Sequence, residues 1–142
     1  MCGRCASAAE GGHLEVLQWA RAHGCEWHGW TCAGAAYNGH LEVLKWAREH
    51  GCPWDEDMED PNRECCCARA AYGGHLEVLK WLREQGCPWD AQTCASAAEG
   101  GSLEVLQWAR EHHCPWNAWT RHFAVKEGHL QLLQWAVDHG AP

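Results

Sequence analysis

The chain has 142 residues, a formal net charge of −8 with neutral histidines, and 46% apolar residues. This length suits one domain, and the mild acidity with scattered basic residues argues against nucleic acid as the main ligand. No apolar run is long enough to span a bilayer, and the first residues lack the apolar segment of a secretory signal. We therefore expect a cytoplasmic protein that does not associate with membranes.

A phrase of eight residues, Gly-His-Leu-Glu-Val-Leu followed by Lys or Gln and then Trp, recurs along the chain. Successive copies are 27, 35, 27 and 27 residues apart, so one unit of 27 residues is repeated with an insertion in the second copy. Such an array predicts stacked units that form a single domain over residues 1–142. The second residue of the phrase is His13, His40, His75, Ser102 and His129. The units span about 2–27, 28–54, 64–89, 90–116 and 117–142.

Each unit predicts two helices, which we call helix A and helix B. In the fourth unit, small residues after a capping Thr93 predict a helix A that stops at Gly100-Gly101. Leu103, Leu106 and Ala109 then follow the spacing of a half-buried helix B. The periodic His before helix B is expected to hydrogen-bond backbone at the Gly-His turn. In chain order, the helices are expected at about 2–10 and 13–23, 30–38 and 40–50, 65–73 and 75–85, 92–100 and 102–112, and 118–127 and 129–139. No pair can bury its apolar stripe alone, so the fold class is an all-α solenoid of about five stacked helix-turn-helix pairs.

These residues resemble the ankyrin-repeat family over the whole chain. Ala97-Ala98 match the Ala pair of the family pattern, Leu79 and Leu82 match its second-helix apolar set, and Gly86 matches its closing Gly. The family repeat has about 33 residues, and the residues missing here fall where the family has a β-hairpin. The family's Thr-Pro-Leu-His start is also absent. The resemblance implies an ankyrin-like fold in which a concave helix-A face meets protein partners.

Binding residues are sought where the copies differ, because stacking requires only the repeated positions. One variable helix-A position reads Ser7, Gly34, Arg69, Ser96 and Phe123, and a second one reads Glu10, Tyr37, Tyr72, Glu99 and Lys126. Tyr and Arg are enriched at interaction hot spots, although a merely solvated face fits the pattern equally well. The candidate partner-binding residues are Tyr37, Arg69, Tyr72, Phe123 and Lys126, with Trp30 and Trp119 before helix A. We therefore expect a non-enzymatic protein–protein interaction module that needs no cofactor.

The chain has 11 cysteines, most of which follow the repeat. Periodic cysteines are interpreted as small buried residues, since an unmodified Cys behaves as a small hydrophobe. The alternative function is metal binding or redox sensing by the periodic Cys and His residues. Cys25 and Cys32 share a Cys-x6-Cys spacing with Cys87 and Cys94, while tetrahedral zinc needs four ligands. The weak candidates for a metal site are Cys2 and Cys5, spaced as CxxC, and Cys65, Cys66 and Cys67.

Three other features lead to expectations. Eleven Trp residues form periodic ladders that are expected to cover the edge of the core, and the acidic insertion at about 55–64 is expected to be a solvated loop. The last helix keeps Leu130 and Val137, so the array end is expected to be uncapped and open to end-to-end self-association. No phosphate-binding loop, nucleophile elbow or zinc-protease motif is present, which agrees with a non-enzymatic protein.

Overall fold

The computed structural model describes residues 3–27, 29–52 and 66–142, which form ten α-helices and no strand within these ranges. Helix A of successive units is α1 (Gly3–Glu10), α3 (Gly29–Tyr37), α5 (Cys66–Gly73), α7 (Ala91–Gly100) and α9 (Ala118–Lys126). Helix B is α2 (Leu14–Ala22), α4 (Leu41–Glu49), α6 (Leu76–Glu84), α8 (Leu103–Glu111) and α10 (Leu130–Asp138). The predicted all-α solenoid of helix pairs is therefore confirmed. The acidic insertion lies outside the described residues.

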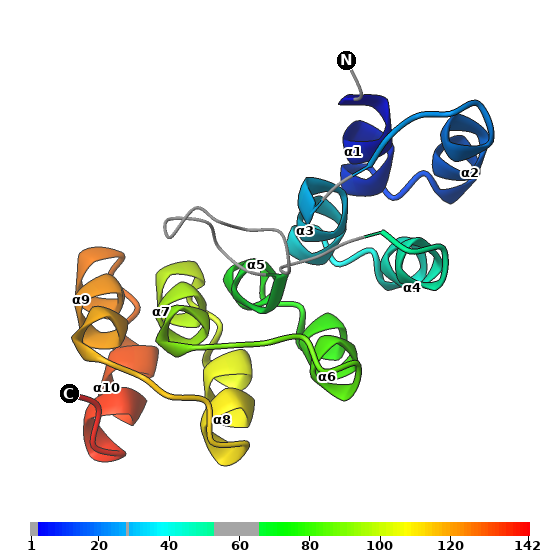
Figure 1. Cartoon of the computed structure of the whole chain (residues 1–142). Helices are drawn as coiled ribbons and strands as arrows, with labels where there is room; N and C mark the ends of the chain where they lie inside the picture. Colours follow the sequence, from blue (N-terminus) through cyan, green and yellow to red (C-terminus); the bar gives the residue numbers. More distant parts are fainter. Residues whose placement is uncertain (1–2, 28, 53–65) are drawn as a thin grey trace.

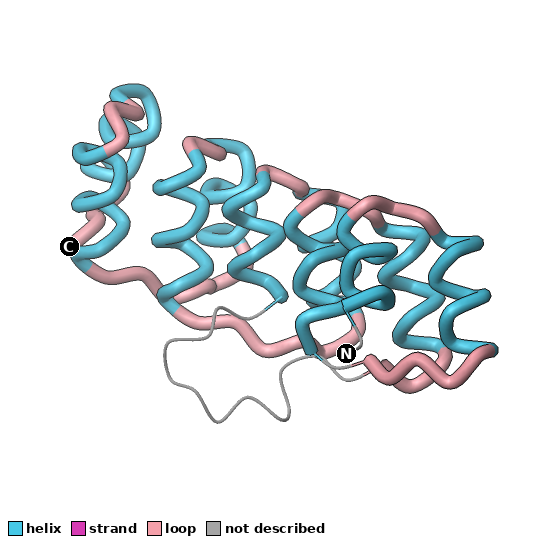
Figure 2. Tube along the Cα trace, turned by 90° about the horizontal axis from the view of Figure 1, so that it is seen from above, coloured by secondary structure: helices cyan, strands magenta, loops and turns pink. Residues whose placement is uncertain are grey.

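The helices form two rows that run the length of the molecule (Figure 1). Each helix A packs against helix A of the neighbouring units and against helix B of its own unit. Within the described residues, short turns and loops connect the helices (Figure 2), and α1 and α10 belong to the units at opposite ends of the stack (Figure 1). We call the row of helices A the inner layer, because the resemblance predicts that it forms the concave side, and the row of helices B the outer layer.

The core lies between the two rows and is built from small residues of helix A and leucines of helix B. Thr93 to Ala98 are six consecutive buried residues of α7, because α5 and α9 cover this helix on two sides and α8 on a third. Val78, Leu79 and Leu82 show the contribution of one helix B, since all three are buried. The predicted core role of the periodic cysteines agrees with this packing, because Cys32, Cys67 and Cys94 are fully buried, among others.

The turn from helix A to helix B depends on two adjacent positions. Gly101 has a φ of 76°, a left-handed conformation that favours glycine. At Gly100, a Cβ atom would collide with the carbonyl oxygen of Tyr72 in the preceding unit. The ring of His129 packs against Gly101 and its Nε2 lies 3.2 Å from the carbonyl oxygen of Glu99. His129 therefore bonds to the turn of the preceding unit, while the rings of His13 and His75 also pack against Gly11 and Gly73 of their own turns.

Thr93 does not cap α7, so that prediction is wrong. The carboxylate of Asp90 accepts a hydrogen bond from the backbone N–H of Gln92 at 2.9 Å, and the helix begins at Ala91. Asn117 caps α9 in the same way, accepting from the N–H of Trp119 at 3.0 Å. The earlier start carries Thr93 into the core, where its hydroxyl is buried without a hydrogen-bond partner.

A chain of polar and aromatic contacts joins the outer layers of neighbouring units. Arg83 donates from Nη1 to the carbonyl oxygen of Cys87 at 2.6 Å, and its guanidinium lies 4.3 Å from the ring centre of Trp89. Trp89 meets Trp108 of the next unit edge to face at 5.8 Å, and Trp108 stacks on His112 at 4.2 Å. The Trp rings thus cover the edge of the core as predicted, but through a ladder that also uses Arg and His.

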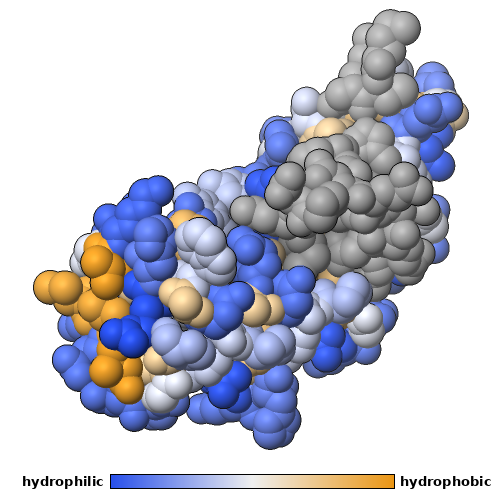
Figure 3. All heavy atoms as spheres, turned by 60° about the vertical axis from the view of Figure 1, so that its left-hand side comes forward, coloured by the Kyte–Doolittle hydropathy of each residue, from blue (hydrophilic) through white to orange (hydrophobic). Residues whose placement is uncertain are grey.

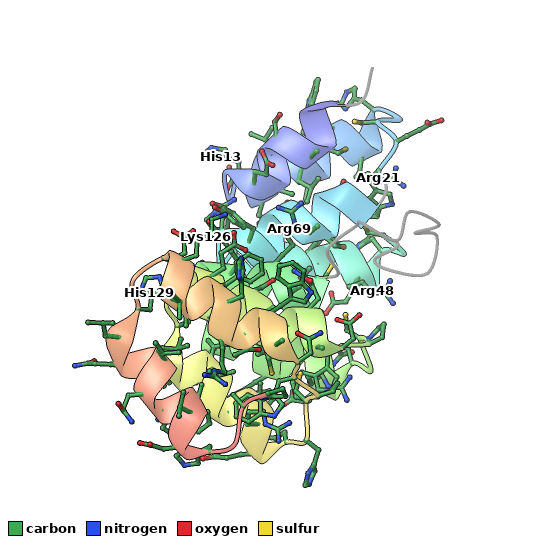
Figure 4. All side chains as sticks on the ribbon, turned by 90° about the vertical axis from the view of Figure 1, so that its left-hand side faces the viewer. His13, Arg21, Arg48, Arg69, Lys126 and His129 are labelled. Atoms are coloured by element: carbon green, nitrogen blue, oxygen red, sulfur yellow. The ribbon has the colours of Figure 1, made fainter. Side chains whose placement is uncertain are left out.

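The ladder recurs at other unit boundaries. It runs from Arg21 through Trp27 and Trp46 to His50, and from Arg110 through Trp116 and Trp135 to His139. The periodic Arg four residues before the corner Cys was the sequence signal for this contact. Figure 4 shows Arg21 and Arg48 at one edge of the solenoid and His13 and His129 at the opposite edge.

Replacing Arg83 by Ala should lower the free energy of unfolding by about 2 kcal/mol, because it removes a charged hydrogen-bond donor and a cation–π contact together. Urea denaturation monitored by circular dichroism measures the change. Arg121, which is exposed at the end of the stack, is the matched control, and its replacement by Ala should change stability by less than about 0.5 kcal/mol. Equal effects of the two substitutions would contradict a structural role for the ladder.

The end of each helix B requires a left-handed residue. Gly86 has a φ of 81°, and three other units also have glycine here, whereas His113 takes the place in the fourth unit with a φ of 67°. An L-residue is strained in this region, although His tolerates it better than most. A Cβ atom at Gly86 would meet nothing within 4 Å, so conformational strain alone decides the preference.

Replacing His113 by Gly should therefore raise the free energy of unfolding by about 0.5 to 1 kcal/mol. This net gain is the backbone strain that is relieved, minus the conformational entropy that Gly adds to the unfolded chain. The reverse substitution, Gly86→His, should lower it by a similar amount. Both changes are measured by thermal and urea unfolding of the same chain. If His113→Gly is destabilising, the side chain of His113 contributes more than its backbone strain costs.

Candidate functional site

The chain has two tyrosines, and the fold stacks them on the inner layer. Tyr37 at the end of α3 and Tyr72 near the end of α5 have ring centres 5.6 Å apart and ring planes 19° apart. Tyr37 is 37% exposed, and Arg69 lies one turn before Tyr72 with its side chain half-buried. These three predicted partner-binding residues therefore gather on adjacent helices.

A pocket of about 350 Å³ adjoins the stacked tyrosines. It is lined by Ala6, Glu10, Ala33, Gly34, Tyr37, Asn38 and Arg69, so it spans α1, α3 and α5. The pocket places a carboxylate on its α1 side and a guanidinium on its α5 side. A partner side chain that enters it would meet both charges beside an aromatic ring.

The second unit has Gly34 at a variable helix-A position beside the pocket, and the lack of a side chain there makes room for Glu10 of the first unit. The side chain of Glu10 lies over Gly34, where a Cβ atom would come within 2.5 Å of its Cγ. Asn38 donates from Nδ2 to the carbonyl oxygen of Gly34 at 3.1 Å and closes the far end of the turn. Sequence reasoning missed Glu10, Gly34 and Asn38 as site residues. The signal was the single Gly in a column that otherwise holds Ser, Arg or Phe.

The remaining candidates form a second cluster on α9. Trp119 is 55% exposed and stacks on Phe123 at 5.6 Å, while His122 meets Trp119 edge to face at 5.1 Å. Lys126 lies one turn beyond Phe123 and is exposed. Helix α7 lies between this cluster and the tyrosines, because it packs against both α5 and α9. The side chain of Trp30 lies outside the described residues.

In each of the first four units the periodic cysteines come together 20 residues apart, and not at the Cys-x6-Cys spacing. Cys32 donates from Sγ to Sγ of Cys52 at 3.3 Å, and both are fully buried. This hydrogen bond, followed by burial, raises the pKa of the Cys32 thiol far above its usual range. A hydrogen bond with Cys94 and burial likewise raise the pKa of Cys114. Both thiols therefore stay protonated and behave as core residues.

The alternative function predicted from the sequence was metal binding by the cysteines. Within the described ranges, no group of three or more His, Cys, Asp or Glu residues is placed to hold a metal ion. Cys5 donates weakly to the carbonyl oxygen of Cys25 at 3.8 Å, and Cys67 to that of Cys87 at 3.8 Å, while Cys66 is buried. The candidates Cys2 and Cys65 lie outside the described residues.

Comparison with protein families agrees with this geometry. A family model described as ankyrin repeats (3 copies) matches residues 5–93, and one described as ankyrin repeats (many copies) matches residues 94–137. The chain belongs to the ankyrin-repeat family. No curated protein matches the chain. Ankyrin repeats are generally protein–protein interaction modules, and the resemblance seen in the sequence is confirmed. None of the helices described in this ankyrin-repeat chain is long and apolar enough to cross a bilayer.

The raised thiol pKa values predict that the ankyrin stack loses stability at high pH. Unfolded thiols release their protons above a pKa of about 8.5, whereas the Cys32 and Cys114 thiols keep theirs in the folded chain. The two thiols contribute fully to the free energy of unfolding below the pKa of the unfolded thiols. Above that pKa, their contribution falls by about 1.4 kcal/mol per pH unit for each thiol.

Urea unfolding in reductant between pH 7.5 and 10 tests this prediction. The double variant Cys32→Ala/Cys114→Ala should show a shallower loss of stability with pH, because only the other titrating groups remain. Parallel profiles for the parent chain and the double variant would contradict the assignment.

Proposed function

We propose that this ankyrin-repeat chain is a non-enzymatic binding module that receives a protein partner on the inner face around Tyr37, Arg69 and Tyr72. The observation that carries the proposal is the stacked tyrosine pair beside a pocket lined by Glu10 and Arg69. Large rings held by a neighbour lose little side-chain entropy on binding, which suits them to anchor an interface. The inner face contributes shape and charge, and no chemical step.

The partner proposed for this face has a basic or mixed-charge edge. The pocket offers a carboxylate and a ring for a partner's cation, and the chain as a whole has a net charge of −8. A cytoplasmic location is part of the proposal, because a buried, hydrogen-bonded thiol such as Cys32 persists in a reducing compartment.

End-to-end self-association stays a prediction. Val16 and Trp19 of the first unit and Leu130 of the last unit are exposed, so both ends of the stack present apolar side chains. Continuing the stack in register would also bury Arg121 and His122 of α9, which disfavours this arrangement. Sedimentation equilibrium over a range of concentrations measures it directly.

The triple variant Tyr37→Ala/Arg69→Ala/Tyr72→Ala should keep the fold and weaken partner binding by roughly 2 kcal/mol or more, about 30-fold in Kd. Peptides selected from a random display library on the immobilised parent chain provide the ligands, and calorimetry measures their affinity. The matched control is Glu49→Ala/Gln85→Ala/Glu111→Ala, three exposed residues of the outer layer, which should leave affinity unchanged.

A second variant, Tyr37→Phe/Tyr72→Phe, keeps the stacked rings and should retain most of the affinity. Unchanged binding by the triple Ala variant, with a native circular dichroism spectrum, would show that partners bind elsewhere. Replacing Gly34 by Leu should also displace the side chain of Glu10 and fill the pocket, while Tyr37, Arg69 and Tyr72 stay in place. Weaker binding by the Gly34→Leu variant would place the ligand in the pocket and not only on the tyrosine rings.

A further inference from the structure

Helix α9 departs from the other inner helices on the side that faces the end of the stack. In α7 this side consists of Cys94, Ala95 and Ala98, which are fully or almost fully buried. The equivalent residues of α9 are Arg121, His122 and Val125, and all three are exposed. The first four units have Cys, Ala and Ala at these three positions. The departure is therefore specific to the last unit.

The altered side of α9 forms a groove with an apolar floor and a basic rim. Its volume is about 570 Å³, and it is lined by Ala118, Arg121, His122, Val125, Lys126 and Pro142. Val125 is 62% exposed, and Leu130 and Val137 of α10 at the same end are 73% and 45% exposed. Figure 3 shows apolar side chains gathered at one end of the molecule with strongly hydrophilic residues beside them. We call the surface formed by Arg121, His122, Val125, Lys126, Leu130 and Val137 the end face.

The groove does not suit another unit of the same array. Successive inner helices approach so closely that only small side chains fit between them, as Thr93 to Ala98 of α7 show. A further helix A in register would bury the charge of Arg121, because the residues at the equivalent position of the other units, Cys5, Cys32, Cys67 and Cys94, are fully buried, and burying an unpaired charge is strongly unfavourable. The end face is therefore poorly suited to the in-register stacking of a further unit.

The charge of the end face is opposite to that of the chain. Arg121 and Lys126 are exposed and form no ion pair with a carboxylate in the described part of the chain, and the net charge is −8. We propose that the end face is a second docking surface, for an amphipathic segment of a partner protein whose apolar side chains alternate with carboxylates. Its apolar residues would cover Val125 and Leu130, and its carboxylates would pair with Arg121 and Lys126. This surface lies beyond α7 from the tyrosine pocket and does not depend on the function proposed for it.

The test uses two synthetic helical peptides of equal length with Leu at every third or fourth position. One has Glu at the remaining positions and the other has Gln. Calorimetry and backbone amide NMR shifts should show that the Glu peptide binds the full chain on α9 and α10. Its affinity should fall with added salt, and the Gln peptide should bind at least about tenfold more weakly.

Charge variants locate the site. The Arg121→Glu/Lys126→Glu variant should bind the Glu peptide at least about tenfold more weakly than the parent chain. The Arg121→Gln/Lys126→Gln variant should lose less affinity. The control Lys45→Glu/Lys80→Glu makes the same change in net charge on the outer layer and should leave binding unchanged. Each variant is first checked for a native unfolding transition.

Three results would overturn the proposal. Equal binding of the Glu and Gln peptides would remove the charge requirement. A dimer of the parent chain that the Arg121→Glu/Lys126→Glu variant dissociates would make a second copy the occupant. Binding to phosphatidylglycerol vesicles, with no binding of the Glu peptide, would make the end face a lipid contact.

Discussion

The close approach of successive inner helices is the constraint on which the rest of the structure depends. At the end of α7, the carbonyl oxygen of Tyr72 occupies the space that a side chain at Gly100 would need. Between these helices only Ala, Cys, Ser or Thr fits, which explains the unbroken run of buried residues from Thr93 to Ala98. The abundance of small residues in this chain is therefore a geometric requirement of stacking, and the buried thiol pairs are one consequence of it.

The large side chains that do not fit between the inner helices lie on the outer layer and at the corners that follow helix B. Trp89 and Trp108 belong to different units yet contact each other, and Arg83 orients Trp89 while it satisfies the carbonyl of Cys87. Each rung of the ladder therefore links neighbouring units as well as covering the core. In an array whose stability is approximately a sum over units and their interfaces, such contacts determine how cooperatively the stack unfolds.

The repeat made the fold predictable, because periodicity and the glycine that recurs between helix A and helix B locate both helices of every unit within a few residues. Contacts between units or between distant parts of a unit were not predictable from spacing alone. Cys94 pairs with Cys114, and not with Cys87, because the corner after helix B folds back on its own helix A. Thr93 looked like a cap, but Asp90 accepts the N–H that a capping residue would receive. The stacked tyrosines were found as variable residues, whereas the pocket beside them is also lined by Glu10 and Gly34, which sequence reasoning missed.

The two surfaces with a proposed function arise from opposite departures from one packing rule. At Gly34 a side chain is missing from a variable column, the side chain of Glu10 lies in the space, and both residues line a pocket between α1, α3 and α5. At Arg121 and His122 large polar side chains replace Cys and Ala, so the same tight spacing no longer admits a neighbour. In this solenoid a smaller residue, Gly34, lies beside a pocket, and larger polar residues, Arg121 and His122, disfavour the stacking of a further unit. The sites therefore lie where a unit differs from its copies, because the shared positions are already used by stacking.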